Sequence, residues 1–269
     1  DGKDHTITAD QDGKYTFTMP AKAVTVTATF EEAISTEIYK RVEYIVNGNG
    51  QYINTGYKAG ANVTVSMDIM ITDWKSSSYG GIVGSRTENH ATNSFIVCRY
   101  GTENSLRSEI GNKNYGYPNI GLNQRATLTL SGNSSFTGTG IELYLFGTNE
   151  NGKLETTYGS VTYRLYSCKI TDGDEVVRNF VPVVRKADGV FGLYDLTGDS
   201  FYASASETGF EGVHDCFTVT NGTTDKNGSI SFDKVLADAG DTVTVTVTPN
   251  KGYQLKSLTV TPVASKEYT

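Results

Sequence analysis

The chain has 269 residues, with 23 Lys and Arg against 30 Asp and Glu, which gives a net charge of −7. Nucleic acids and acidic lipid headgroups attract basic surfaces, so this balance argues against both as partners. No apolar run approaches the roughly 18–20 residues that a membrane span needs, and we expect no membrane insertion. The abundance of Tyr, with 17 residues against one Trp, together with frequent Thr and Val, favours a soluble protein built mostly of β-strands.

Both ends of the chain have a strand-like pattern. In residues 1–32, apolar residues alternate with Thr over 15–19 and again over 24–30, so each strand would present one apolar face and one threonine face. Residues 213–269 have the same texture, most clearly over 242–248, where Thr alternates with Val. Neither end segment is long enough to close a good core alone, because small β units usually need support from elsewhere.

The centre of the chain, residues 33–212, carries many short strand-like runs separated by turn clusters rich in Gly, Asn and Ser. A polar link over 33–40, with one helical turn, precedes them. The expected strands are 42–46, 51–55, 63–71, 81–84, 94–99, 125–130, 141–146, 161–170, 176–182, 190–194 and 200–202. This pattern predicts an all-β chain with an antiparallel β-sandwich, a jelly roll, over 33–212 and small β-module pieces over 1–32 and 213–269.

The central domain resembles the concanavalin A-like lectin/glucanase superfamily, in particular the laminin-G-like domains of bacterial surface and phage-related proteins. The segments that carry this resemblance are 44–45, 50–56, 164–170, 180–182, 192–196 and 201–202. The sequence departs from the family's pattern at Asn54, where Asp is common. The resemblance implies the two-sheet fold and a carbohydrate or glycoprotein ligand.

The two ends resemble the divergent internalin-type B-repeats of bacterial extracellular proteins. Residues 12–30 are similar to the end of such a repeat, and residues 241–260 are similar to its middle. The resemblance implies an extracellular location on the bacterial cell surface, with any signal peptide or anchor outside this sequence. It also implies two half-repeats with unpaired strand edges, which could pair within one chain or associate between chains.

Catalytic motifs are missing from the sequence. Laminarinase-type relatives place carboxylates in an E-x-D-x-E strand pattern, and this chain has none, nor does it contain HExxH or G-x-S-x-G. A Ser/His/Asp triad assembled in space stays open. The acidic run 172–175 contains a Gly and is typical of a hairpin tip; within it, Asp172 and Asp174 are candidate calcium ligands, and we expect no other cofactor.

Cysteines are few and scattered. Cys98, Cys168 and Cys216 form no CxxC pair, and we interpret them as small buried hydrophobes rather than as a disulfide framework or a metal cluster.

Ligand-binding candidates lie in polar and aromatic loops. Trp74 stands beside a Ser-rich segment and is either a sugar-stacking platform or a core residue. Tyr115 and Tyr117 belong to an amide-rich run over 112–119, which is either a sugar-binding loop or simply an ordered loop. Arg86 and Asn89 could add hydrogen bonds to the same ligand, as could Arg99 and Arg107.

Four residues of the late strands are expected to be structural: Arg164, Tyr166, Tyr194 and Asp195. We expect Arg164 and Asp195 to form a buried or half-buried ion pair. The sequence as a whole predicts a non-enzymatic adhesin fragment that binds a glycan or glycoprotein. The alternatives are a spacer without a ligand and a glycoside hydrolase.

Overall fold

The computed structural model describes residues 14, 16–18, 21, 23–26, 34–48, 50–74, 79–87, 93–101, 105–155 and 161–262. The chain divides into two compact units, residues 1–33 and residues 34–269. The described residues of the first unit form no strand or helix. Most of segment 12–30 therefore lies outside the described residues, and its expected pairing with residues 241–260 stays a prediction.

The described part of the second unit is built of short strands joined by turns and loops, without a helix. The strands are β1 Tyr39–Arg41, β2 Ile45–Val46, β3 Ile53–Lys58, β4 Val63–Asp73, β5 Tyr79–Arg86, β6 Ser94–Tyr100, β7 Ser105–Gly111, β8 Lys113–Tyr117, β9 Arg125–Ser131, β10 Glu142–Leu145, β11 Asn149–Glu150, β12 Lys153–Leu154, β13 Thr162–Asp172, β14 Glu175–Arg185, β15 Val190–Asp195, β16 Ser200–Ala203, β17 Glu211–Gly212, β18 Phe217–Thr218, β19 Gly228–Phe232, β20 Leu236–Ala237 and β21 Val245–Pro249.

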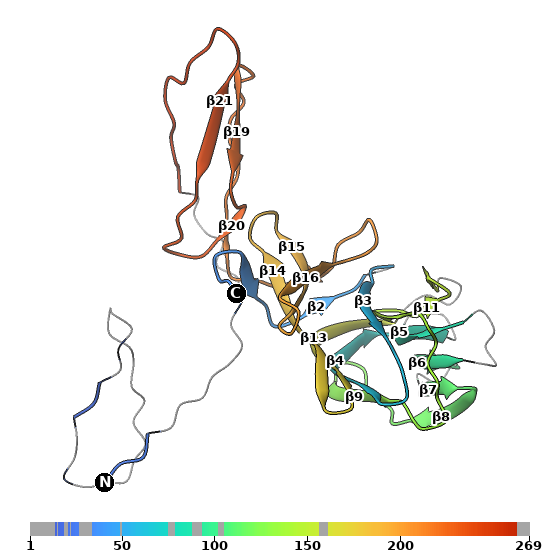
Figure 1. Cartoon of the computed structure of the whole chain (residues 1–269). Coiled ribbons are helices and arrows are strands. Elements are labelled where there is room, and N and C mark those ends of the chain that lie inside the picture. Colours follow the sequence, from blue (N-terminus) through green and yellow to red (C-terminus); the bar gives the residue numbers. More distant parts are fainter. Residues whose placement is uncertain are drawn as a thin grey trace. The chain divides into compact units, whose positions relative to one another are not determined.

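Two sheets form the body of this unit (Figure 1). Among the described residues, a nine-stranded sheet runs in the order β16-β15-β14-β13-β2-β17, with β1 beside β14 and with β4 between β13 and β9. An eight-stranded sheet runs β12-β11-β5-β6-β7-β8, with β10 joining β3 to β5. The strand pairs are antiparallel except for β11 with β5. The sheets pack as a sandwich and not as a closed barrel, so the predicted fold class is confirmed.

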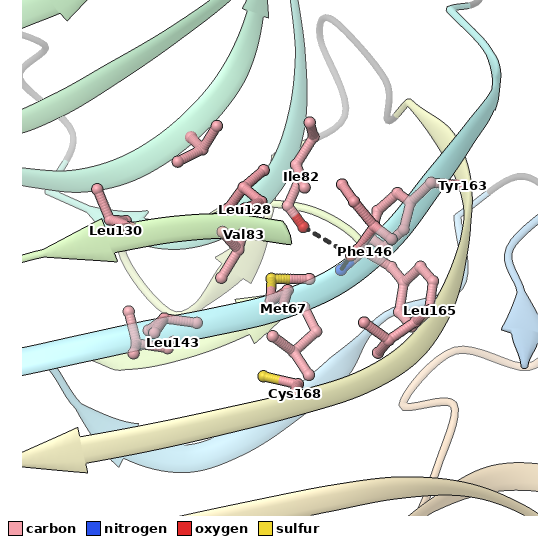
Figure 2. Close-up of a cluster of buried hydrophobic side chains, with 14 of the residues drawn as sticks. Met67, Ile82, Val83, Leu128, Leu130, Leu143, Phe146, Tyr163, Leu165 and Cys168 are labelled. Carbon is pink, nitrogen blue, oxygen red and sulfur yellow. Dashed lines mark hydrogen bonds between the residues drawn. The ribbon is translucent and has the colours of Figure 1, made fainter. Parts of the chain in front are cut away.

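The core lies between the sheets and follows from a period of two in the longest strands. On β4, every second residue from Val63 to Ile71 is fully buried, while the residues between them are half-exposed. From the other sheet, Ile82, Val83 and Leu143 join the same buried cluster (Figure 2). Burial of each such aliphatic side chain contributes roughly 1.5–3 kcal/mol, which makes this layer the main source of stability.

Strand β13 changes its register against β4 partway along its length. Tyr163 and Leu165 point into the core, and so do Cys168 and Ile170, which are out of step with the first pair by one residue. A β-bulge between Leu165 and Ser167, opposite β4, supplies the extra residue. Because of the bulge, both halves of a long strand keep their apolar residues inside.

Residues 213–262 form a separate pair of small ribbons. Strand β18 pairs with β20, and β19 pairs with β21, with Ile230 opposite Val247 and Phe232 opposite Val245. These four side chains share one face and are only half-buried, while the Ser and Thr residues between them are exposed. Strand β21 thus finds its described partner within the C-terminal segment.

One local prediction was wrong. Residues 112–119 were expected to form a loop, but Lys113–Tyr117 is strand β8, paired with β7, whose own range was not predicted as a strand. The turn expected within residues 33–40 is present at 36–38, where the amide of Tyr39 donates to the carbonyl of Ser35 at 2.9 Å, as in one turn of a helix, and it leads directly into β1. In β7 the charged residues Arg107 and Glu109 and the polar Ser108 lie between Leu106 and Ile110, so no regular alternation of apolar residues is seen in the sequence.

Candidate functional site

A polar hollow of about 460 Å³ lies where three loops meet at one end of the eight-stranded sheet. The loops are the β5–β6 connection, the β7–β8 turn and the 132–138 segment before β10. The residues that line the hollow are Thr87, Asn93, Gly111, Asn112, Ser135 and Thr137. We call this hollow the loop pocket.

Strand pairing brings these loops together. Ser94, the first residue of β6, is opposite Gly111, the last residue of β7, so Asn93 and Asn112, which flank these two residues in the chain, lie at the same end of the sheet. Gly111 has φ of +62°, which suits Gly at this two-strand turn and directs the chain straight into β8. The Asn93 side chain donates a hydrogen bond to the carbonyl of Gly138, which fixes the third loop against the first.

The chemistry of the loop pocket is that of hydroxyls and amides. Among the described residues, its lining side chains are Thr, Ser and Asn, which offer both donors and acceptors and carry no charge. Such a surface matches a ligand that is itself uncharged and rich in hydroxyl groups. None of the described lining groups titrates near neutral pH, so these groups supply no general acid or base.

Arg86 stands beside the loop pocket and is already paired. It is the last residue of β5, next to Thr87, and its Nε atom lies 3.2 Å from Oε1 of Glu150. Its Nη2 atom lies 3.3 Å from Oε2 of the same carboxylate, which makes the pair bidentate. Arg86 is therefore positioned near the pocket with its charge balanced. Asn89 lies outside the described residues, and its predicted role stays a prediction.

The two tyrosines of β8 have different surroundings. Tyr115 is 40% exposed and is available to a ligand. Tyr117 packs against the core, and its hydroxyl donates to the carbonyl of Thr129 on β9 at 2.8 Å. This bond links the edge strands of the two sheets, and burial raises the pKa of Tyr117. Tyr117 therefore has a structural contact, while Tyr115 keeps its candidacy as an aromatic surface.

Trp74 is not a surface platform. Its side chain is 7% exposed and belongs to the main hydrophobic cluster, and its carbonyl accepts a hydrogen bond of 2.8 Å from Nη1 of Arg99. Of the two interpretations of Trp74, core packing is the one that this burial supports, because a stacking platform must leave a ring face open.

The outer face of the nine-stranded sheet carries a second polar hollow of about 440 Å³, lined by Ser66, Asp68, Thr127, Ser167, Cys168, Lys169 and Asn179. Unlike the loop pocket, it includes charged side chains. Asp68 is held by Arg125 through bonds of 3.0 and 2.7 Å. The guanidinium of Arg125 in turn lies 3.8 Å from the ring centre of Tyr166.

The expected pairing of Arg164 with Asp195 is wrong. Arg164 lies over the ring of Tyr44, 4.2 Å from its centre. Asp195 is fully buried at the end of β15, and its Oδ2 atom lies 3.6 Å from Nε of Arg178. The sequence could not settle this, because Arg164 is on the outward side of β13 while Arg178 comes from the neighbouring strand β14.

Asp195 and Tyr194 are structural, as expected. The Oδ1 atom of Asp195 accepts hydrogen bonds from the backbone amides of Asn179 and Thr197, at 2.8 and 3.1 Å. The Tyr194 hydroxyl donates to Asp199 across the β15–β16 turn, and this bond is the main reason that the pKa of Tyr194 is raised to about 12. Asp195 thus ties the β15–β16 turn to the neighbouring strand β14.

The acidic run 172–175 is the tip of the β13–β14 hairpin, as predicted. Asp172 accepts a hydrogen bond of 2.7 Å from the hydroxyl of Tyr57. Burial and the bond to this carboxylate together raise the pKa of Tyr57 to about 12. Among the described residues, Asp172 and Asp174 do not belong to a cluster with metal-ligand spacing. Their role as calcium ligands stays a prediction.

The cysteines are unpaired, and two of them are buried as expected. Burial raises the pKa of the Cys98 thiol to about 11 and raises that of Cys168 further. Both thiols are therefore protonated and unreactive at neutral pH. Cys216 is half-exposed and lies in the C-terminal segment.

A family model described as Divergent InlB B-repeat domain matches residues 1–34 and 218–269. The predicted resemblance of both ends to this repeat is confirmed. The match leaves out the sandwich and covers less than half of the chain, so the lectin-like resemblance of the centre stays a prediction. This bacterial repeat family is usually found in extracellular surface proteins.

Two further comparisons, with curated proteins and with solved structures, gave no match. In the part of the chain that the structure describes, no helix is long and apolar enough to cross a membrane.

Proposed function

We propose that this chain belongs to a bacterial surface adhesin and that its lectin-like sandwich binds a neutral carbohydrate, free or on a glycoprotein, in the loop pocket. The observation that carries the proposal is the lining of that pocket, which consists of hydroxyl and amide groups from three loops. Sugar hydroxyls both donate and accept hydrogen bonds, and hydroxyl and amide side chains together offer both donors and acceptors to them. The B-repeat family of the ends supports the extracellular location.

The proposed role is binding without catalysis. Glycoside hydrolases need two carboxyl groups, about 5–10 Å apart, on either side of the sugar bond. The side chains that line the loop pocket, in the part of the chain that the structure describes, carry hydroxyl and amide groups, which cannot take this role. Weak affinity at one pocket would be sufficient for adhesion if several copies are displayed together, because linked sites gain avidity.

The test is a glycan array probed with the whole chain, followed by calorimetric titration of any glycan that binds. Asn112→Ala and Thr137→Val alter the loop pocket, and each should weaken binding about tenfold by removing one hydrogen-bond partner. Thr127→Val is the matched control, because Thr127 is also exposed but lines the second hollow. Weakening by Thr127→Val alone would move the site to the nine-stranded sheet.

A spacer without a ligand is the second candidate, favoured by the presence of repeat segments at both ends. Silence across a broad array of neutral glycans would support the spacer and overturn the proposal. Release of reducing sugar from β-glucans would instead support a hydrolase.

We also propose that the chain self-associates through its repeat segments. The support is the half-buried apolar face of the β19–β21 ribbon, which a two-stranded ribbon cannot cover by itself. Sedimentation velocity over a concentration series would detect association, and a chain that stays monomeric at high concentration would contradict it.

A further inference from the structure

Lys186 directly follows β14, and only 1% of its side chain is exposed. A buried ammonium is costly unless carboxylates compensate it. Its Nζ atom lies 2.7 Å from Oδ2 of Asp238 and 2.7 Å from Oδ2 of Asp241. Both carboxylates belong to the turn after β20, so a cation of the sandwich is neutralised by the C-terminal segment.

A second lysine uses the same turn. Lys40, on β1, places its Nζ atom 2.9 Å from Oδ1 of Asp238 and 3.2 Å from Oδ1 of Asp215. Asp238 therefore binds one lysine with each of its two oxygens; Lys40 lies on β1 and Lys186 directly follows β14. We call Lys40, Lys186, Asp215, Asp238 and Asp241 the lysine–aspartate cluster.

The backbone at Lys186 joins the same two parts. Its carbonyl accepts hydrogen bonds from the amides of Val235 and Leu236, at 2.9 and 3.0 Å, and its own amide donates to the carbonyl of Ile38 at 2.9 Å. Leu236 is 5% exposed and Ala237 is 7% exposed. The root of the C-terminal segment is thus buried and hydrogen-bonded as well as ion-paired.

The cluster is filled by lysines rather than arranged for a metal. Asp215, Cys216 and Asp238 have ligand atoms within 4.8 Å of one another, a spacing that a cation could use. However, the two ammonium groups already lie within 3.2 Å of these carboxylates and supply the positive charge.

We propose that the lysine–aspartate cluster fastens the C-terminal segment, residues 213–262, to the sandwich as one rigid piece. Segments joined by a linker ordinarily move relative to one another, so rigidity here requires specific contacts. Because Lys186 is buried, salt screens its ion pairs less than it screens surface pairs. A mechanical force applied to the C-terminal segment would therefore be transmitted directly to β1 and β14.

The experiment is amide hydrogen exchange and ¹⁵N relaxation on the whole chain. In the unaltered protein, the amides of Val235 and Leu236 should be protected, and residues 213–262 should tumble with the sandwich, including at 0.5 M NaCl. Lys186→Met should speed exchange at Val235 and Leu236 about tenfold or more, while Ile170 on β13 keeps its protection and reports that the sandwich is folded.

Arg185→Met is the matched control. Arg185 precedes Lys186 and forms a half-exposed pair with Asp188, 2.6 Å apart, on the sandwich alone. The Arg185→Met substitution should leave the rate of amide exchange at Val235 and Leu236 unchanged. If Lys186→Met does not fold, Lys40→Met decides, because Lys40 is only half-buried.

Unchanged protection and shared tumbling in the folded lysine variant would overturn the proposal. Independent tumbling of residues 213–262 in the unaltered protein would overturn it as well.

Discussion

The hydroxyl of Tyr163 donates a hydrogen bond of 2.9 Å to the carbonyl of Ile82 and thereby joins the two sheets inside the core (Figure 2). The same oxygen accepts a bond of 2.8 Å from the amide of Phe146, whose ring stacks on Tyr163 with centres 4.5 Å apart. Burial raises the pKa of Tyr163 well above its usual value, so the phenol is protonated at any physiological pH.

Replacing Tyr163 by Phe should lower the free energy of unfolding by about 1–3 kcal/mol, because two buried backbone groups lose their partner while the ring stays in place. Urea unfolding followed by fluorescence measures this. Tyr115→Phe, at an exposed position on β8, should change the stability by less than about 0.5 kcal/mol. Equal effects of the two substitutions would show that the buried hydroxyl does not join the sheets as described.

Gly84 allows β5 and β6 to approach closely. Its φ is +141°, and a Cβ atom there would clash with the carbonyl of Phe95 and lie 2.7 Å from Cα of Ile96. Gly84→Ala should therefore destabilise the sandwich by about 2 kcal/mol or more. Gly60→Ala is the control, because no atom lies near its added methyl group. A melting temperature that is equally unaffected in both variants would contradict the register of β5 with β6.

Arg178, and not Arg164, should control the stability of the buried carboxylate Asp195. Arg178→Met removes the guanidinium and leaves the charge of Asp195 uncompensated, which should lower the free energy of unfolding by an amount on the order of 3 kcal/mol. Arg164→Met removes a half-exposed contact with the Tyr44 ring and should cost about 0.5–1 kcal/mol. Denaturant unfolding of both variants compares the two costs, and the reverse order would restore the pairing expected from the sequence.

Acid should weaken the lysine–aspartate cluster. Hydrogen bonds from Lys186 lower the pKa of Asp238 and of Asp241 below the usual 3.8. Their contribution to stability is therefore complete above about pH 5 and is lost as the pH falls through the lowered pKa values.

At the basic end, hydrogen bonds to Asp238 raise the pKa of Lys40. Burial lowers the pKa of Lys186, but its bonds to the two aspartates outweigh burial, and the net shift is upward. The lysine contribution is thus complete below the usual pKa of 10.5 and is lost as the pH rises through the raised values. The contribution of the lysine–aspartate cluster to stability should therefore be constant between about pH 5 and pH 9.

Urea unfolding between pH 7 and pH 3 tests the acid limb. The chain with both Asp238→Asn and Asp241→Asn should be less stable than the unaltered chain at pH 7, and the difference should shrink as the pH falls below about 4. A difference that stays constant with pH would mean that these carboxylates are not ionised partners of the lysines.

The sequence predicted the elements whose pattern is regular. Strict alternation over 63–71 corresponds to β4, and the strand-like run over 161–170 corresponds to β13, because one face of each must be buried. Strand β8 was not predicted, since it lies at a sheet edge, where four of its five residues are exposed and burial leaves little pattern.

The candidate site was predictable only in part. The polar loops at Arg86 and at residues 112–119 were singled out, and the loop pocket does include Thr87 and Asn112. Ser135 and Thr137 were missed, because their segment is typical of an ordinary turn. What brings it to the pocket is a contact across the fold, from Asn93 to the carbonyl of Gly138, which leaves no local pattern.

The central claim, that the sandwich binds a neutral carbohydrate in the loop pocket, is tested most directly by NMR titration of the whole chain with a glycan selected on the array. We predict saturable chemical-shift changes at the amides of Thr87, Asn112 and Thr137, which Asn112→Ala weakens about tenfold. An array on which no neutral glycan binds, or shift changes confined to the nine-stranded sheet or to residues 213–262, would contradict it.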